Sequence, residues 1–141
     1  MKILILSQWF DPEPTIKGSV FTRELVKKGL DVVVITGFPN YPGGKLYPGY
    51  KLKFFQKEKI YGTTVYRVPL LPSHNSNMFL RAINYISFSF FALLYSPFLV
   101  KSPQVIYSYH PPITVGVIAV IVKYIKKSKL VLDIQDIWPE S

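Results

Sequence analysis

The sequence predicts an α/β fold, a doubly wound, Rossmann-like parallel sheet with helices on both faces. Two observations predict it. The chain opens with a short apolar run, a proline-containing loop and an amphipathic segment, the strand–loop–helix unit that usually founds such a sheet. Further apolar runs of strand length follow, separated by segments with helical spacing of apolar residues, as helical crossovers require. The expected parallel strands are Lys2–Ser7, Asp31–Thr36, Gln104–Tyr109 and Leu130–Ile134.

The composition limits both the domain count and the classes of partner. A chain of 141 residues with 49% hydrophobic residues has room for one domain with one core and is not disordered. It has no cysteine, which excludes disulfides and thiolate metal sites. Its net charge of +9 predicts an anionic partner: membrane lipid, nucleotide phosphate or nucleic acid. The sequence carries no recognised nucleic-acid-binding motif, so we expect no nucleic acid partner.

The first strand leads into the loop Gln8–Gly18. Its Asp11-Pro-Glu-Pro14 stretch stops regular structure, because proline lacks the N–H group and restricts the preceding residue. Gly29 is expected to end the helix that follows. The helix itself is predicted from apolar residues at helical spacing, namely Ile16, Val20, Phe21 and Leu25.

The stretch after the second strand is read as irregular structure followed by a peripheral β-hairpin. Gly37–Tyr50 contains three prolines and four glycines and is therefore a long loop, either functional or held down by its four aromatic residues. Lys51–Gln56 and Thr63–Val68 read as short extended runs, joined by the polar turn Lys57–Gly62.

Asn77–Val100 is predicted to be one long helix. From Ala82 to Val100 it has 19 uncharged residues, about 28 Å as a helix and close to the roughly 30 Å hydrocarbon core of a bilayer. A membrane-spanning helix is therefore an alternative. A single crossing would, however, separate Gln104–Tyr109 from the sheet that it must join. We expect a long buried or interface-lying helix instead.

The last third of the chain repeats the strand–loop–helix pattern. The strand Gln104–Tyr109 is followed by His110-Pro-Pro112, and then by an apolar helix over Ile113–Ile125. The final strand leads to Asp136, close to the end of the chain. A doubly wound sheet without its last helix is incomplete. The sequence is therefore expected to be the front part of something longer.

Five stretches together resemble the amino-terminal domain of family 4 glycosyltransferases, which are retaining enzymes of the two-domain GT-B fold. The nearest resemblance is to the subgroup that transfers sugars such as L-fucosamine onto lipid-linked O-antigen or capsule intermediates. The stretches occur in the same order and spacing as in the family and cover essentially the whole chain. They read SQWFDPEPTIKG, TGFPNYPGGKLYPGY, VPLLPSHNS, YSYHPPITVG and LVLDIQDIWPES.

The resemblance implies a role in bacterial surface polysaccharide or lipopolysaccharide biosynthesis. A sugar would pass from a nucleotide-sugar donor, a substrate rather than a cofactor, to a lipid-linked saccharide acceptor. The protein would act in the cytoplasm, peripheral to the inner face of the membrane and bound to its anionic surface. In this family the carboxyl-terminal domain binds the donor. That domain is expected to be absent from this chain or supplied by a partner chain, so residues 1–141 alone are expected to be inactive. The alternative is a catalytically inactive, membrane-associated remnant or binding module.

Four residues are candidates for the site. Lys17 and Gly18 precede the first helix, whose free N–H groups suit a phosphate; a solvated loop lysine is the alternative. Asp136 is a candidate base for the acceptor hydroxyl, or else a helix N-cap. The resemblance makes His110 a catalytic candidate, although the family's active-site histidine aligns with Tyr109, one residue earlier. With two histidines and no cysteine, no metal site is expected.

The order of strands predicts where these residues meet. In a doubly wound sheet Lys2–Ser7 should lie beside Gln104–Tyr109, because the strand order reverses between them. The loops that leave these two strands would then flank one crevice. We therefore expect Lys17, Gly18, His110 and Asp136 to converge at a single edge of the sheet.

Overall fold

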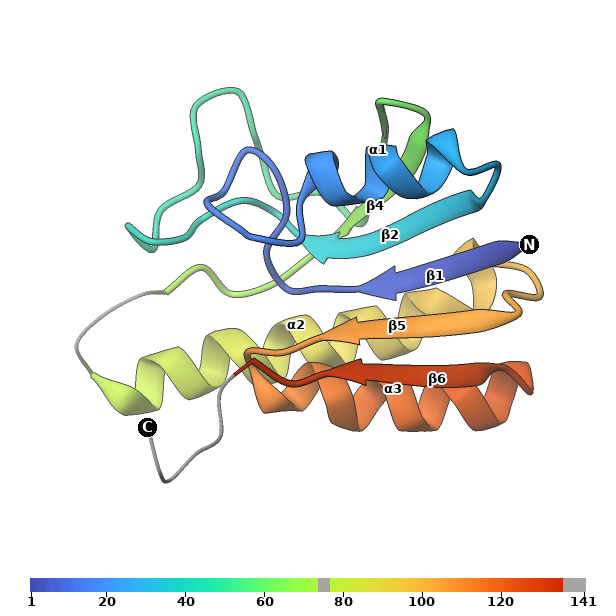
Figure 1. The fold of residues 1–141 in the computed structure, drawn as a ribbon. Helices are drawn as coiled ribbons and strands as arrows, with labels where there is room; N and C mark the ends of the chain where they lie inside the picture. The colour runs from blue at the N-terminus through green and yellow to red at the C-terminus, as the bar shows by residue number, and fades with distance from the viewer. Residues whose placement is uncertain (74–76, 136–141) are drawn as a thin grey trace.

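The computed structural model describes residues 1–73 and 77–135, which form one six-stranded sheet covered by helices on both faces (Figure 1). The strand order is β3-β4-β2-β1-β5-β6. The strands are β1 Lys2–Leu6, β2 Asp31–Gly37, β3 Gln56–Ile60, β4 Thr63–Val68, β5 Val105–Tyr109 and β6 Lys129–Asp133. The helices are α1 Ser19–Lys27, α2 Met78–Leu99 and α3 Ile113–Lys126.

The predicted parallel sheet is confirmed. The four apolar runs are β1, β2, β5 and β6, each within one residue of its expected bounds, and each neighbouring pair runs parallel. β1 lies between β2 and β5, so that Leu4 is opposite Val33 on one side and Ile106 on the other. The chain therefore reverses its direction of winding at β1. The carboxyl ends of β1 and β5 form the switch point, where such sheets bind their ligands.

The two faces of the sheet bury separate cores. Alternate residues of β1 point to opposite faces: Ile3 and Ile5 pack with Phe10 on the α1 side, and Leu4 and Leu6 pack on the side of α2 and α3. Figure 1 shows α1 alone on one face and α2 and α3 together on the other. This is the doubly wound arrangement expected from the sequence.

The first helix differs from the prediction in the residues that it buries. Ile16 lies before α1 and is 77% exposed, and Val20 is 64% exposed. The side chains that pack toward the sheet are Phe21, Leu25 and Val26. The helix begins at Ser19, after Lys17 and Gly18 as expected, and Val20 faces away from the sheet. The expected end is confirmed, because Gly29 has a φ of +80° and its N–H donates to the carbonyl of Val26.

The predicted hairpin at the periphery of the sheet is confirmed, and its second strand, β4, has the expected bounds Thr63–Val68, but its first strand is not where the sequence predicts it. β3 occupies Gln56–Ile60, most of which is predicted as the polar turn Lys57–Gly62, and the actual turn is the dipeptide Tyr61-Gly62. Both residues have positive φ, 47° and 83°, as a two-residue hairpin turn requires. Charged residues on an exposed edge strand concealed the alternation of β3. β4 also pairs parallel with β2, which joins the hairpin to the main sheet and makes β3 the edge strand on that side.

The long helix α2 is attached to the sheet along one face. Asn77 caps it, with Oδ1 accepting a hydrogen bond from the backbone N–H of Phe79 at 2.9 Å. Phe88 and Ala92 are buried against the sheet. Asn84, also buried, accepts from Gln8 Nε2 at 2.6 Å and donates through Nδ2 to the carbonyl of Leu71 at 2.7 Å. α2 is long and apolar enough to cross a membrane, with a mean hydropathy of 1.4, but 28% of that stretch is buried inside the protein.

β6 is the outermost strand of the described sheet on the side opposite β3. Its single neighbour among the described residues is β5. Several of its apolar side chains are exposed: Val131 is 46% and Leu132 45% exposed, and Ile134, just after the strand, is 62% exposed. The sheet therefore has a charged edge at β3 and an apolar edge at β6.

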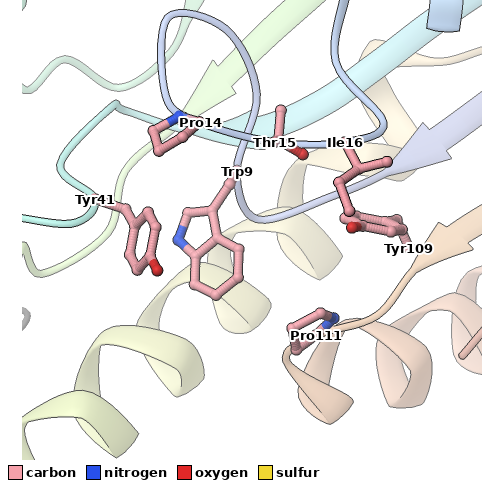
Figure 2. Close-up of a pocket in the computed structure, with 7 residues that line it drawn as sticks. All are labelled: Trp9, Pro14, Thr15, Ile16, Tyr41, Tyr109 and Pro111. Atoms are coloured by element: carbon pink, nitrogen blue, oxygen red, sulfur yellow. The ribbon is translucent and has the colours of Figure 1, made fainter. Parts of the chain in front are cut away.

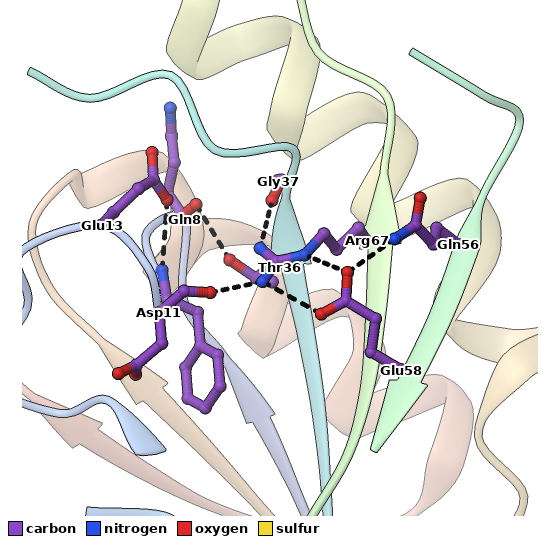
Figure 3. Close-up of polar contacts among 9 residues, drawn as sticks. Gln8, Asp11, Glu13, Thr36, Gly37, Gln56, Glu58 and Arg67 are labelled. Carbon is purple, nitrogen blue, oxygen red and sulfur yellow. Dashed lines mark hydrogen bonds and ion pairs between the residues drawn. The ribbon is translucent and has the colours of Figure 1, made fainter. Parts of the chain in front are cut away.

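A buried arginine joins the hairpin to the loops at the carboxyl edge of the sheet (Figure 3). Arg67 on β4 is 0% exposed. Its Nε donates to Glu58 Oε1 at 2.9 Å and its Nη1 to the carbonyl of Gly37 at 3.3 Å, and Nη2 donates to the carbonyl of Asp11. The guanidinium also lies 5.0 Å from the centre of the Tyr50 ring. One side chain thus links β3, β2 and the loop after β1.

We expect Arg67→Met to lower the free energy of unfolding by about 3 kcal/mol, because it leaves a carboxylate and two carbonyls without their buried partner. Urea unfolding measures this value. The control is Lys59→Met, on an exposed position of the same hairpin, which should change it by less than about 0.5 kcal/mol. Equal losses in the two variants would contradict a structural role for Arg67.

Candidate functional site

A hollow of about 570 Å³ lies where β1 and β5 end (Figure 2). The loop after β1 supplies one part of its wall and the loop after β5 another, which confirms that these two loops flank one crevice. We call this hollow the aromatic pocket, lined by Trp9, Pro14, Thr15, Ile16, Tyr41, Tyr109 and Pro111.

Trp9 is the largest side chain of the aromatic pocket. Its ring centre lies 4.6 Å from that of Tyr41, with the planes tilted by 33°, and 6.3 Å from that of Tyr85 on α2, edge to face. Ser7 fixes the backbone here by donating from Oγ to the carbonyl of Trp9 at 2.8 Å. Aromatic side chains held in this way offer flat faces against which a ring-shaped ligand can pack.

Glu13 holds the two walls of the pocket together. Its Oε1 accepts from the backbone N–H groups of Asn40 and Tyr41, both at 2.8 Å, and its Oε2 accepts from the N–H of Phe10 at 3.3 Å. The residue is 3% exposed. Burial raises the pKa of Glu13 to about 7, although the three N–H groups and the charge of Arg67 act to lower it.

The N-terminus of α1 is occupied by a carboxylate of the chain itself. Asp11 Oδ2 accepts from the backbone N–H of Ser19 at 2.5 Å, and Oδ1 accepts from Ser19 Oγ at 2.8 Å. A Cβ at Gly18 would lie 2.3 Å from Asp11 Oδ2, so glycine permits this close approach. The geometry thus gives Gly18 a structural role. A phosphate at this terminus, which remains a prediction, would have to displace Asp11.

Lys17 also has a partner within the protein. Its Nζ lies 3.7 Å from Asp133 Oδ2, at the end of β6, and 4.8 Å from the centre of the Phe21 ring. The same carboxylate accepts from the hydroxyl of Tyr107 on β5, and this hydrogen bond, followed by those of Gln135 and Lys17, lowers the pKa of Asp133. Burial, and then this carboxylate, raises the pKa of Tyr107. Lys17 therefore bridges the ends of β1 and β6, beside the aromatic pocket rather than in its lining.

The structure places Tyr109, rather than His110, in the lining of the pocket. His110 lies between two lining residues, and its backbone N–H donates to the carbonyl of Asp133 at 3.0 Å. Its Nδ1 is buried, and no hydrogen-bond partner for it occurs among residues 1–73 and 77–135. Asp136, the other catalytic candidate, lies outside the described residues. Of the four predicted site residues, Lys17 and His110 thus both contact Asp133 at this edge, and neither lines the pocket.

Trp9 and Tyr41 are the residues that the sequence reasoning missed. Trp9 directly follows the first buried strand, and an aromatic residue at that position, at the carboxyl edge of a parallel sheet, was an available signal. Tyr41 was counted among four aromatics that could hold the long loop down. In the structure Phe38 is one that does so, being 0% exposed, whereas Tyr41 lines the pocket.

A metal-dependent site is not evident in the part of the chain that the structure describes, where no three His, Asp or Glu side chains cluster as ligands would. The aromatic pocket can instead pack against a ring and place it beside the hydroxyl of Tyr109. That arrangement suits the binding of an uncharged or weakly charged ring-shaped group.

No protein-family model matches the chain, and a search of curated proteins found no significant match.

The stability of the protein should fall as the pH rises from about 4.5 to 8. A carboxyl group whose pKa is about 7 in the folded protein, against an ordinary value of 4.5, binds its proton more tightly when folded. This tighter proton binding adds about 3 kcal/mol to the free energy of unfolding. The contribution is fully present below pH 4.5 and is lost as the pH rises past 7. Thermal unfolding across this pH range measures the change.

Glu13→Gln should remove that pH dependence, whatever its effect on stability at any one pH. The matched control is Glu24→Gln on α1, an exposed carboxyl whose pKa is lowered by the side chain of Lys27. The control should retain the wild-type slope between pH 4.5 and 8. If the slope survives in Glu13→Gln, another group is responsible for it.

Proposed function

We propose that this chain is the acceptor-side, amino-terminal domain of a retaining family 4 glycosyltransferase of the GT-B fold. The observation that carries the proposal is the aromatic pocket at the carboxyl ends of β1 and β5, the switch point of the sheet. It fits a saccharide, because aromatic faces pack against the apolar face of a sugar ring. The resemblance of five stretches of sequence to the family supports the same assignment.

In this proposal the pocket holds the terminal sugar of a lipid-linked acceptor. Trp9 packs against the sugar ring, and the Tyr109 hydroxyl orients it. Sugar transfer requires a proton to leave the attacking hydroxyl, a role for which His110 and Asp136 are the candidates. The donor, a nucleotide sugar, would be bound by a second domain or partner chain facing this edge. Lys17 lies at the same edge and would approach the donor phosphates if it left Asp133.

The surface formed by α2 and α3 supports attachment to a membrane. The two helices pack side by side on one face of the sheet, and both turn apolar side chains to solvent. Soluble monomers rarely expose apolar patches of such extent. The α2–α3 apolar face comprises Met78, Phe79, Ile86, Phe90, Leu94 and Phe98 on α2, and Ile113, Val117, Ile121, Tyr124 and Ile125 on α3.

Cationic residues gather at one end of this face. α2 and α3 both begin at the pocket edge of the sheet and end at the opposite edge, where the lysines lie. An apolar face with a cationic end is the arrangement that binds the surface of an anionic bilayer. The contacts of Asn84 with Gln8 and Leu71 hold α2 against the protein, which favours peripheral attachment at the cytoplasmic face over a membrane span. The lysines are Lys101, Lys123, Lys126, Lys127 and Lys129.

Binding to vesicles should rise with their anionic lipid content and fall with added salt. Replacing both Lys101 and Lys129 by Gln should weaken it about tenfold or more, since each lysine near an anionic surface contributes about 1 kcal/mol. Vesicle co-sedimentation measures the effect. The matched control replaces Lys27 and Lys28, which are also exposed but lie at the end of α1, on the opposite face of the sheet from α2 and α3. Equal weakening by the two pairs would argue against a specific membrane face.

The acceptor assignment is tested by measuring the affinity of the chain for a polyprenyl-diphosphate-linked monosaccharide in detergent micelles. Isothermal titration calorimetry gives this affinity. Trp9→Ala should weaken binding about tenfold or more, the usual effect of truncating a central aromatic contact. The control, Phe54→Ala, removes an aromatic side chain that is 85% exposed elsewhere on the surface and should leave binding unchanged. Failure of the wild-type chain to bind any lipid-linked saccharide would contradict the proposed function.

A further inference from the structure

We propose that a groove between α2 and α3 binds the hydrocarbon chain of the lipid-linked acceptor, next to the pocket that takes its sugar. This inference rests on the proposed function and adds to it a second binding site. The groove is a hollow of about 280 Å³, separate from the aromatic pocket. It is lined by Ile86, Ser89, Phe90 and Leu93 on α2 and by Thr114 and Val117 on α3.

The groove adjoins the aromatic pocket along both of its helices. On α2, Tyr85 precedes the groove residue Ile86, and its ring packs edge to face with that of Trp9 at 6.3 Å. On the α3 side, Pro111 lines the pocket and Thr114 lines the groove. The two residues are three positions apart, so their Cα atoms are separated by at most about 11 Å. Figure 2 shows Pro111 directly before the first turn of α3. A molecule with its head in the pocket can therefore extend a tail into the groove.

The lining of the groove suits an apolar chain. Three of its side chains leave much of their surface to water: Ile86 is 60%, Phe90 61% and Val117 57% exposed. A hydrocarbon lying between them would remove that surface from solvent. Two small hydroxyls complete the lining. Ser89 Oγ and Thr114 Oγ1 are buried, and neither has a hydrogen-bond partner within the described ranges 1–73 and 77–135. Thr114 lies in the first turn of α3, at the end of the groove nearest to Pro111 in the sequence.

Two other occupants of the groove fit the structure less well. A bilayer phospholipid would occupy the groove without filling the aromatic pocket that adjoins it. A second protein would cover the whole α2–α3 apolar face and would leave the aromatic pocket beside the groove empty. The acceptor's own chain is the occupant that begins at the pocket.

The first test measures how affinity depends on chain length. The probes are n-alkyl β-glucosides from hexyl to dodecyl, used below their micelle-forming concentrations. The chain has two tryptophans, so Trp138→Phe leaves Trp9 in the pocket as the single fluorescent reporter. We expect affinity to rise about fourfold for each added methylene until the groove is full, and then to level off. Affinity that does not depend on chain length would overturn the inference.

The second test blocks the groove in the same background. Val117→Phe fills it without adding a second tryptophan and Phe90→Ser removes one wall, so both variants should bind dodecyl glucoside no more tightly than hexyl glucoside. Phe98→Ser is the matched control, because Phe98 is a phenylalanine of the same helix, 78% exposed and outside the groove. It should keep the full dependence on chain length while weakening binding to vesicles.

The outcomes separate this inference from the proposed function. If the groove variants bind the long glucosides as the wild type does, the inference fails, and the acceptor assignment stands as long as Trp9→Ala weakens binding of the lipid-linked saccharide. If the wild type binds neither glucosides nor lipid-linked saccharides, both fail. A concentration-dependent dimer that dissociates on Phe90→Ser, detected by sedimentation velocity, would assign the groove to a second copy and overturn the inference. Circular dichroism on each variant checks that it folds, and Val117→Phe and Phe90→Ser serve as independent tests.

Discussion

One buried guanidinium organises the carboxyl edge of this sheet. Arg67 is enclosed by the protein and donates to the carbonyl of Gly37, the last residue of β2, and to that of Asp11 in the loop after β1. The charge remains buried because Glu58 on the neighbouring strand accepts two of its hydrogen bonds, at 2.9 and 3.3 Å. Asp11, whose carbonyl Arg67 holds, in turn caps α1 through its side chain. The loop that carries Trp9 is thereby fixed at Asp11 and again at Glu13.

The sequence was sufficient for the parallel sheet because buried strands are short, continuous apolar runs, and β1, β2, β5 and β6 all have that character. It was insufficient for β3, where exposed charged residues conceal the alternation, and for the burial pattern of α1, where Ile16 and Val20 are apolar but exposed. The position of the site followed from topology alone. Its composition did not, because contacts between residues far apart in sequence, such as Glu13 with Tyr41, decide which aromatic side chains reach the pocket.

The two carboxylates of the first loop explain why the predicted site and the observed pocket are not the same. Anion binding at the start of α1 was inferred from free N–H groups, yet Asp11 takes the N–H of Ser19. Glu13 likewise takes N–H groups of the loop that carries Tyr41. Negative charge is thus supplied from within, and the surface left to a ligand is aromatic. The apolar groove between α2 and α3 begins next to that surface, so both hollows favour a ligand that is partly sugar and partly hydrocarbon.

The apolar edge at β6 has a consequence for handling the protein. A parallel edge strand offers unpaired N–H and C=O groups, and here it carries Val131 and Leu132, which are about half exposed. Edge strands with that composition are templates for intermolecular strand pairing, a process that detergent micelles covering α2 and α3 would leave untouched. Turbidity during purification would then have its origin in the sheet rather than in the helices. A charged residue in place of Leu132 would act as a gatekeeper against it.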